Sequence, residues 1–336
     1  MKWISIVVPC YNSAEYVERC VDSLLVGGDD VEVIIVNDGS TDDTPKIADE
    51  YARRYPNVVK VVHQPNGGHG EAINSGLKEA SGRYFRVVDS DDWLDADAFS
   101  SLLSAMKSQD ELADMFVTNY VYTHADGTAD NVIDYRREFK KGKACNWSQT
   151  RKFRLATYLT LHSVTFKTEL VRRSGVVCPK HTFYEDNYFV YVPLKYVETF
   201  KYVDVDLYRY YIGREGQSVQ GDVFARRYAQ QIYVSELIFK QYDLAQEIKL
   251  NAKRGKCLYH NCRMVMSVAT AGARLNCSDE ADQNVNDMWN RCIEHDEKYG
   301  KKLRYHTPIA LQMFPGKSGR NFANGLYRIT RKLVKN

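Results

Sequence analysis

Three aspartates within four positions, in the run DSDDW (89–93), directly follow a short apolar segment. Like charges this close repel one another, and each carboxylate costs free energy when it is taken out of water. The cluster therefore needs either open solvent, as in a turn, or a divalent cation. Carboxylates in a D-x-D spacing suit a Mg²⁺ or Mn²⁺ ion that bridges to the phosphates of a substrate. Asp89 and Asp91 stand in that spacing and are candidate metal ligands.

Two further polar loops carry groups that suit a nucleotide. NDGSTDDT (37–44) supplies Asp38, whose carboxylate could accept a hydrogen bond from a base or a ribose, although the run also fits a turn with a helix N-cap. QPNGGHG (64–70) has three glycines, which let backbone N–H groups approach a phosphate or a nucleobase. It lacks both the Lys-Ser/Thr of a P-loop and the G-x-G-x-x-G spacing, which argues against an ATPase or a dehydrogenase.

The elements that separate these loops predict that they converge. In the N-terminal part of the chain, short apolar runs alternate with amphipathic helical patterns, which indicates βαβ units and a mostly parallel sheet with helices on both faces. Strands are expected at 4–8, 31–36, 58–63, 83–88 and 113–122, and helices at 14–25, 40–55, 70–81 and 95–109. Ligands bind such sheets outside the carboxyl ends of the strands. The loops PCYN, NDGSTD, QPNGGHG and DSDDW all leave those ends, so we expect them at one edge.

The second half of the chain predicts a different organisation. Polar and aromatic pieces around 125–155 suggest a hairpin or lid, short β-like runs follow around a helix that starts near Glu185, and later residues have helical spacing. We expect an α/β domain followed by a mainly helical region. The expected bounds are 1–220 for the α/β domain, with a donor and metal half at 1–125 and an acceptor half at 126–220, and 221–336 for the helical region.

Composition is that of a globular protein and gives one clue to a partner. With 44% hydrophobic and 26% charged residues, the 336-residue chain can bury a core, and a net charge of +3 gives no reason to expect nucleic acid. From Lys298 to Asn336 there are ten Lys or Arg and no Asp or Glu. FANGLYRITRKLVKN (322–336) has the spacing of a basic amphipathic helix, which could lie on an anionic membrane, dock on its own domain, or contact another copy of the chain in a homo-oligomer.

Cysteines and apolar stretches bear on the compartment. The eight cysteines lack the paired spacing of a zinc site, and we expect reduced structural thiols. The apolar stretch after Lys2 is too short for a secretory signal, and no stretch approaches the roughly 20 apolar residues of a membrane span. We therefore expect a cytoplasmic protein, with the inner face of the plasma membrane as its candidate surface.

The motifs, taken together, resemble those of the family 2 glycosyltransferases, which have the GT-A fold. The order and spacing match for IVVPCYN (6–12), VNDGSTDDT (36–44), NGGHGEAINSG (66–76) and VVDSDDW (87–93). FYEDNYF (183–189) is similar to the family's ED motif, and LYRYYIGREGQSV (207–219) to a Tyr-rich strand followed by an Arg and a Ser. After about residue 220 the resemblance fades.

The resemblance implies a donor nucleotide-sugar, most often a UDP-sugar, bound by the first loops. The backbone around Pro9 and the ring of Tyr11 would hold the uracil, with Glu15 near the ribose. Asp38 would accept the uracil N–H, and Asn66–Gly67 would approach the nucleoside through the backbone.

The resemblance also implies the metal site and the catalytic base. Asp89 would lie by the ribose and the metal, and Asp91 would ligate Mn²⁺ or Mg²⁺ under the diphosphate. Asp186 would be the general base that takes a proton from the acceptor hydroxyl, in a reaction that inverts the anomeric centre. Arg214 and Ser218 are candidates for contacts to the diphosphate.

Two positions depart from the family pattern, and a second histidine has no assigned role. Ile73 stands where many relatives carry an Arg, and His69 where a smaller residue is common. His162, which we expect on a strand that leads towards the acceptor side, is a further candidate.

The expected activity is transfer of one hexose or N-acetylhexosamine to a cell-surface polysaccharide, teichoic-acid-like polymer, glycolipid or glycoprotein. Two alternatives stay open. A nucleotidyltransferase acting on sugar phosphates also places metal-binding aspartates at such a sheet edge, but it releases pyrophosphate. A non-catalytic glycan-binding scaffold subunit would need the D-x-D or the base to be absent, and both are present.

Overall fold

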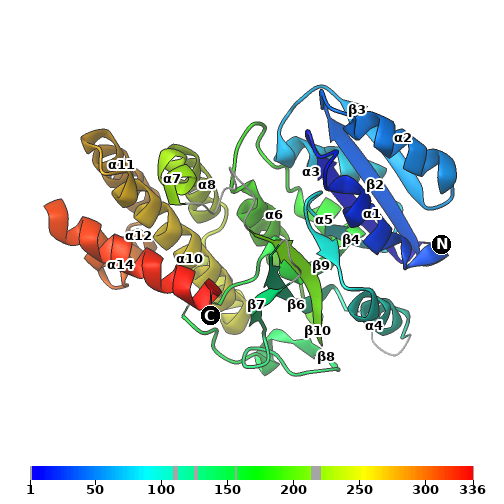
Figure 1. Ribbon diagram of the computed structural model, residues 1–336. Helices are drawn as coiled ribbons and strands as arrows, with labels where there is room; N and C mark the ends of the chain where they lie inside the picture. Colours follow the sequence, from blue (N-terminus) through cyan, green and yellow to red (C-terminus); the bar gives the residue numbers. More distant parts are fainter. Residues whose placement is uncertain (1, 109–112, 125–127, 156, 213–220, 336) are drawn as a thin grey trace. The chain divides into compact units, whose positions relative to one another are not determined.

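A computed structural model describes residues 2–108, 113–124, 128–155, 157–212 and 221–335 (Figure 1). Its contacts divide the chain into two compact units that interleave along the sequence. The first, called the sheet unit, comprises Met1–Lys152, Leu159–Thr182 and Tyr196–Ile212. The second, called the helical unit, comprises Phe153–Tyr158, Phe183–Lys195 and Gly213–Asn336. The predicted domain boundary at residue 220 stays a prediction, and the segment that carries Asp186 groups with the C-terminal helices.

The sheet unit begins with a parallel four-stranded arrangement in the order β3-β2-β1-β4. The strands are β1 (Ile4–Cys10), β2 (Val31–Asp38), β3 (Val59–Gln64) and β4 (Tyr84–Val87), and the helices between and after them are α1 (Val17–Leu25), α2 (Thr44–Arg54), α3 (His69–Glu79) and α4 (Ala96–Lys107). In the register of β1 and β2, Cys10 lies opposite Asn37 at the carboxyl ends. The loops that follow these strands therefore start side by side, as predicted.

Beyond β4 the sheet becomes mixed. The next strands in order are β9 (Val164–Lys167), β6 (Met115–Thr123), β10 (Thr199–Tyr211) and β5 (Trp93–Leu94), with β7 (Ala129–Ile133) on β6, β8 (Ala144–Asn146) on β10, and α5 (Thr168–Ser174) after β9. β9 runs antiparallel to both β4 and β6, whereas β6 and β10 are parallel. The α/β class is confirmed, and the predicted parallel pairing holds from β3 to β4.

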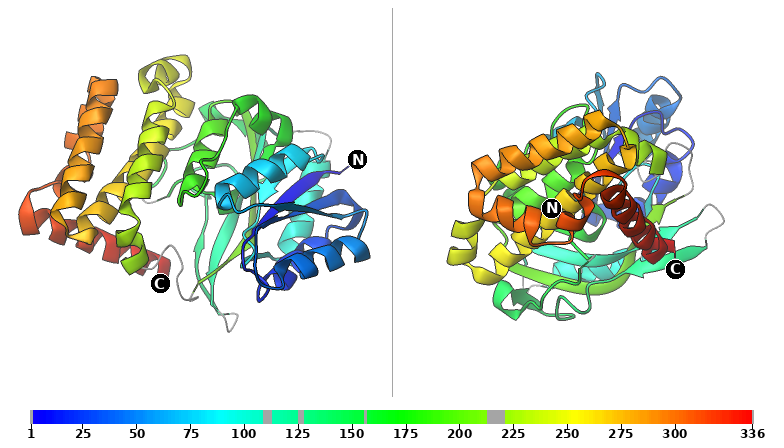
Figure 2. Two further views of the ribbon diagram at one scale, coloured as in Figure 1. Left: turned by 90° about the horizontal axis from the view of Figure 1, so that it is seen from above. Right: turned by 90° about the vertical axis from the view of Figure 1, so that its left-hand side faces the viewer.

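Burial explains why β1 and β2 are mostly apolar and do not alternate between apolar and polar residues. Every residue of β1 and β2 is buried, because helices cover both faces of this part of the sheet (Figure 2). On one face, Ile4, Ile6 and Val8 form a core with α1, α2 and α4. On the other face α3 lies so close that a Cβ at Gly76 would be 2.4 Å from the side chain of Val7. All eight cysteines are free, as expected for structural thiols.

The helical unit contains α6 and the C-terminal helices (Figures 1 and 2). Its helices are α6 (Glu185–Leu194), α7 (Gly221–Arg226), α8 (Tyr228–Lys240), α9 (Leu244–Leu250), α10 (Ala252–Asn276), α11 (Asp279–His295), α12 (Glu297–Tyr305), α13 (Ile309–Gln312) and α14 (Gly316–Lys335). The long helix α10 contacts α6, α8, α9, α11 and α14. None of the described helices combines the length and the apolar character that a bilayer crossing requires.

Candidate functional site

The loop after β1 is bonded to the loops after β2 and β4. The backbone N–H of Asn12 donates to Ser40 Oγ over 3.0 Å, and the Asn12 side-chain oxygen accepts from the N–H of Thr41 over 2.8 Å. The hydroxyl oxygens of Ser13 and Ser90 lie 2.7 Å apart. Polar side chains therefore tie together three of the four loops that the sequence predicted at one sheet edge.

Asp38, at the end of β2, organises the glycine-rich loop. Its side chain is only 2% exposed, and its two carboxylate oxygens accept from the N–H groups of Gly67 and Gly68, each over 2.8 Å. The side-chain amide of Asn66 donates to the Asp38 carbonyl over 3.0 Å. Gly68 has a φ of +86°, and a Cβ there would lie 2.7 Å from the backbone N of His181. The structure thus brings Asp38, Asn66 and Gly67 together, with the Asp38 carboxylate holding the loop.

The acidic run lies beside this loop. His69 Nε2 is 2.9 Å from Asp89 Oδ1, and this contact links the glycine-rich loop to the loop after β4. Asp92 is 1% exposed and accepts from the Tyr208 hydroxyl over 2.6 Å and from the Tyr211 N–H over 2.7 Å. The N–H of Asp89 donates to the Tyr208 oxygen over 3.1 Å. The third aspartate is therefore a buried group bonded to β10 and does not lie in a solvated turn.

The carboxylates of this run affect one another's protonation. Burial raises the pKa of Asp92 well above its usual range, and the nearby carboxylates of Asp91 and Asp89 raise it further. Burial also raises the pKa of the Tyr208 hydroxyl, and the negative charges of Asp89 and Asp92 add to this effect. The repulsion inferred from the sequence is present in the fold, and a divalent cation would relieve it.

One group of described residues has the donor atoms and spacing for a metal ion. Asp89, Asp92 and His162 each offer one ligand atom, and these atoms lie within 4.8 Å of one another. The His162 ring packs against Tyr208 and Tyr210, with centroids 4.8 and 4.7 Å away. Burial lowers the pKa of His162 to about 4, so the imidazole is neutral and able to ligate a metal. Carboxylate oxygens with one imidazole fit a divalent ion such as Mn²⁺.

Asp91, the other predicted ligand, lies next to this group. It is half-buried, and its backbone carbonyl accepts from Arg19 Nη2 over 3.0 Å. The Arg19 guanidinium also lies 3.8 Å from the centroid of the Trp93 ring, so one side chain holds two positions of the acidic run. The role of Asp91 as a metal ligand stays a prediction.

The remaining residues predicted to bind the donor nucleotide-sugar differ in how exposed they are. Pro9 is buried at the end of β1, whereas Glu15 is exposed and Tyr11 is 54% exposed in the loop that follows. An exposed ring at this edge is suited to stacking on a base, and Glu15 lies close by in the chain. Arg214 and Ser218 lie outside the described residues.

Sequence reasoning missed Tyr208 and assigned His162, which it did name as a candidate, to the wrong element. Tyr208 was seen only as part of a tyrosine-rich run, yet its hydroxyl contacts both Asp89 and Asp92. His162 was expected on a strand, but it lies in the 3₁₀ turn Leu161–Ser163 that precedes β9. The usable signal was the alternation of tyrosines in LYRYY (207–211), which predicts that alternate rings face the same side of a strand.

In the helical unit, Asp186 lies in the first turn of α6. It is half-buried, and one of its carboxylate oxygens accepts from the Asn187 side-chain amide over 3.0 Å. Tyr184, which precedes the helix, has a φ of +70°, a left-handed conformation that is costly for a residue with a Cβ. Glu185 is buried. The predicted helix start near Glu185 is confirmed, and it presents Asp186 at the positive end of the helix dipole.

Comparisons with known proteins find similarity to glycosyltransferases. Residues 5–167 match the model of Glycosyl transferase family 2. The chain is 31% identical over 224 residues to the putative glycosyltransferase EpsH of Bacillus subtilis (strain 168), which covers 62% of this chain and 60% of that protein. It is 44% identical over 100 residues to the uncharacterized glycosyltransferase EpsJ of the same organism, which covers 30% of this chain and 29% of that one. The matches thus span less than two thirds of each relative.

Solved structures resemble a larger part of the chain. The crystal structure of S. aureus TarS 1–349 in complex with UDP-GlcNAc superposes with a TM-score of 0.70 at 19% identity, over 99% of this chain and 92% of TarS 1–349. The mannosyltransferase PcManGT from Pyrobaculum calidifontis, in complex with GDP-Man and Mn²⁺, gives a TM-score of 0.51 at 16% identity, over 98% and 86%. At these identities the likeness concerns the fold alone.

Proposed function

We propose that this chain is an inverting, metal-dependent glycosyltransferase, because residues 5–167 match the model of Glycosyl transferase family 2 and the chain resembles the fold of TarS. It moves a hexose or an N-acetylhexosamine from a UDP-sugar to a hydroxyl of a cell-surface glycan, glycolipid or glycoprotein. The observation that carries the proposal is the junction of the Asp38-bound glycine-rich loop with the acidic run at Asp89, through His69.

Residues of the sheet unit bind the donor. The loop held by Asp38 presents backbone groups of Asn66 and Gly67 to the nucleoside, and Tyr11 stacks on the base. The complexes of TarS with UDP-GlcNAc and of PcManGT with GDP-Man and Mn²⁺ support a nucleotide-sugar donor and a divalent ion here. Asp89 and His162, with Asp91 or Asp92, would hold that ion, which supplies positive charge against the departing diphosphate.

Asp186 of the helical unit acts on the acceptor. Displacement at the anomeric carbon needs a base that takes the proton of the attacking hydroxyl, opposite to the side on which the leaving group departs. A half-buried carboxylate at a helix start, held by an amide, suits this role. Attack from the face opposite to the leaving diphosphate inverts the anomeric configuration.

The experiment that tests the function scores UDP release from a panel of nucleotide-sugars. The full chain is assayed with Mn²⁺, with Mg²⁺ and with chelator, in the presence and absence of cell-wall and lipid extracts, and the anomeric configuration of the product is read by NMR. Acceptor-dependent UDP release with inversion supports the proposal. Pyrophosphate release from an NTP and a sugar phosphate would favour the nucleotidyltransferase, and glycan binding without turnover would favour the scaffold.

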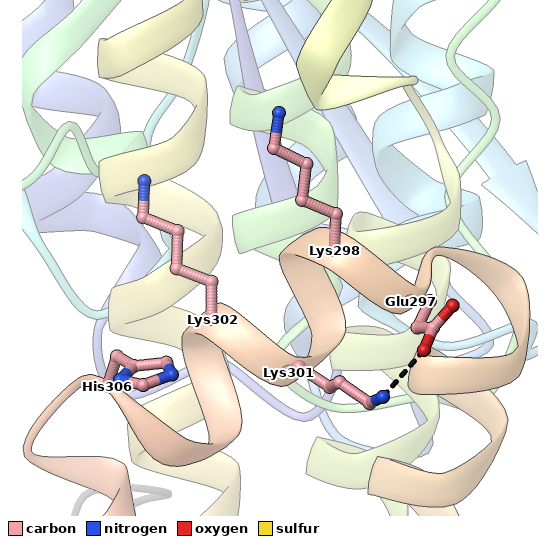
Figure 3. A pocket seen from close by; sticks show the side chains of 5 residues that line it. All are labelled: Glu297, Lys298, Lys301, Lys302 and His306. Atoms are coloured by element: carbon pink, nitrogen blue, oxygen red, sulfur yellow. Dashed lines mark hydrogen bonds and ion pairs between the residues drawn. The ribbon is translucent and has the colours of Figure 1, made fainter.

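A basic surface of the helical unit supports contact with an anionic membrane, and with it a location on the inner face of the plasma membrane. A hollow of about 320 Å³ on α12 is lined by five residues. Figure 3 shows their side chains, which are those of Glu297, Lys298, Lys301, Lys302 and His306. Lys301 is paired with Glu297, whereas Lys298 and Lys302 extend away from that pair in Figure 3. Exposed lysine side chains carry positive charge and therefore attract anionic lipid headgroups.

Exposed apolar residues follow the basic ones in the chain. Leu311 and Phe314, between α12 and α14, are 44% and 54% exposed, and α14 is helical through Lys335. Basic and apolar side chains together are typical of a surface that lies on a bilayer. Replacing Lys298, Lys302 and the four basic residues Arg328, Arg331, Lys332 and Lys335 by Gln should abolish co-sedimentation with anionic liposomes at low salt. Unchanged co-sedimentation would remove the membrane claim, and a change in mass by light scattering would indicate a homo-oligomer instead.

A further inference from the structure

The turn that leads into α6 needs support from outside itself. Tyr184 adopts a left-handed conformation with a φ of +70°, and His181 in the same approach has a φ of +48°. Residues with a Cβ hold such conformations only where the surroundings enforce them. Since Tyr184 directly precedes Glu185 and Asp186, whatever enforces its conformation also sets the direction in which the Asp186 carboxylate points.

The contacts that hold this turn come from the junction of α7 and α8. The N–H of Phe183 donates to the side-chain oxygen of Gln230 over 3.1 Å. The Arg227 guanidinium carbon lies 3.3 Å from the centroid of the Phe183 ring, a close flat stack. The Tyr184 ring meets Phe224 edge-on, with centroids 6.5 Å apart. The turn is therefore held by a hydrogen bond to its backbone and by contacts with the rings of two successive residues, Phe183 and Tyr184.

The rest of α6 has its own anchors, so these contacts bear on its first turn alone. The Tyr188 hydroxyl donates to the side-chain oxygen of Gln241 over 2.8 Å, and the Tyr242 hydroxyl donates to the carbonyl of Val192 over 2.6 Å. Loss of the grip on Phe183 should leave the body of the helix in place and free only the turn before it.

Asn187 connects the turn to the carboxylate. Its side-chain amide donates both to the Tyr184 carbonyl over 3.2 Å and to Asp186 Oδ1 over 3.0 Å. A change in the Tyr184 peptide would therefore move the amide that orients Asp186. Displacement of a catalytic group by about 1 Å can lower a rate on the order of 100-fold.

We propose that Arg227 and Gln230 are positioning residues for Asp186: they hold the turn at Phe183 and Tyr184 and so fix the direction of the carboxylate. The inference rests on the proposed function, in which Asp186 is the general base. Arg227 suits the task because a planar guanidinium can lie flat on a ring, which the ammonium of a lysine cannot do.

The test measures kcat, acceptor KM and UDP affinity in the full chain. Arg227→Lys keeps the charge but not the flat stack, and Gln230→Ala removes the acceptor for the Phe183 N–H. Each should lower kcat roughly 10- to 100-fold, with acceptor KM and calorimetric UDP affinity within about twofold of the wild type. Arg226→Lys, a change at the exposed neighbouring arginine, is the matched control and should keep the wild-type kcat. Gln230→Glu, which still accepts a hydrogen bond from the Phe183 N–H, should keep most of the wild-type kcat that Gln230→Ala loses.

A double-mutant cycle separates positioning from direct substrate contact. If Arg227 acts through Phe183, then Arg227→Lys should have little further effect on kcat in a Phe183→Leu background. A full additional loss in that background, or a loss confined to acceptor KM, would overturn the inference. If Arg227→Lys fails to fold, the comparison of Gln230→Ala with Gln230→Glu decides, and equal activity of the two overturns it. Absence of sugar transfer by the wild type would instead refute the proposed function.

Discussion

The acidic loop of the sheet unit and the first turn of α6 carry the two halves of the proposed chemistry, and they are built differently. Asp89 lies in a loop tied by hydrogen bonds to neighbouring loops and to β10, so strand order places it. Asp186 lies on a helix that packs on other helices, behind a left-handed residue held by side chains. Sheet topology preorganises the proposed donor site, whereas the orientation of the proposed base, Asp186, depends on a few local contacts.

The largest expected effect tests the role of the α6 carboxylate. Asp186→Asn should lower kcat by about 10² to 10⁴, because the amide cannot accept the proton of the acceptor hydroxyl. UDP affinity, measured by calorimetry, should match the wild type. Asp279→Asn, a change at an exposed acid in the first turn of α11, is the control. Turnover that persists in Asp186→Asn would assign the base elsewhere.

The next largest effect tests Asp89, the carboxylate that lies at the edge of the sheet. Asp89→Asn should lower turnover on the order of 10² to 10³, since it weakens the charge stabilisation of the leaving diphosphate. It should also weaken Mn²⁺ binding followed by electron paramagnetic resonance, and chelation of the wild type should abolish activity until Mn²⁺ is added back. Asp97→Asn, at an exposed acid of α4, should change neither. Wild-type Mn²⁺ affinity in Asp89→Asn would refute the metal assignment.

A smaller effect is expected at Gly68, and comparison with Gly142 separates a shift of the glycine-rich loop from backbone strain. Gly68 and Gly142 have nearly the same φ, +86° and +82°, but only a Cβ at Gly68 would meet other atoms, at 2.7 Å from the His181 backbone. Alanine at either position is strained by roughly 1 to 3 kcal/mol. Gly68→Ala should in addition shift the loop that Asp38 holds and weaken UDP binding about tenfold, or about 1.4 kcal/mol. Equal UDP affinities in the two variants would show that the loop does not contact the donor.

The smallest effect concerns a carboxylate that serves the sheet and not the site. Burial alone would raise the pKa of Asp114, but Lys167 at 2.8 Å and the N–H groups of Thr199 and Glu198, each at 3.0 Å, outweigh it and lower the pKa. The ionised form therefore stabilises the fold above the unfolded pKa, and this contribution is lost as pH falls through the folded value.

Asp114→Asn should accordingly destabilise the protein by about 1 to 3 kcal/mol at pH 7 and much less under strongly acidic conditions. Urea unfolding of both proteins across that pH range measures the difference. A penalty that does not depend on pH would mean that the ion pair with Lys167 is not the cause.

Local sequence patterns predicted the strands, the helices and the meeting of the four loops. A run such as VEVIIV (31–36) is apolar at five of its six positions because it is covered on both faces, and the amphipathic spacing of α1 follows from its single buried side. Polar loops after parallel strands then meet at one edge whatever the rest of the chain does. The candidate residues Asp38, Asn66, Gly67 and Asp89 were predictable for this reason.

Only the tertiary structure distinguished the three aspartates of DSDDW and identified their partners. Asp92 is buried because Tyr208, on a strand far along the chain, bonds to it, and His162 faces the cluster because β9 enters the sheet antiparallel between β4 and β6. Asp186 belongs to the helical unit because α6 packs on α8 and α10. Periodicity and turn chemistry act over neighbouring residues, so the sequence by itself determined the elements and the loops between them. Contacts between distant residues depend on strand order and helix packing, which no local pattern contains.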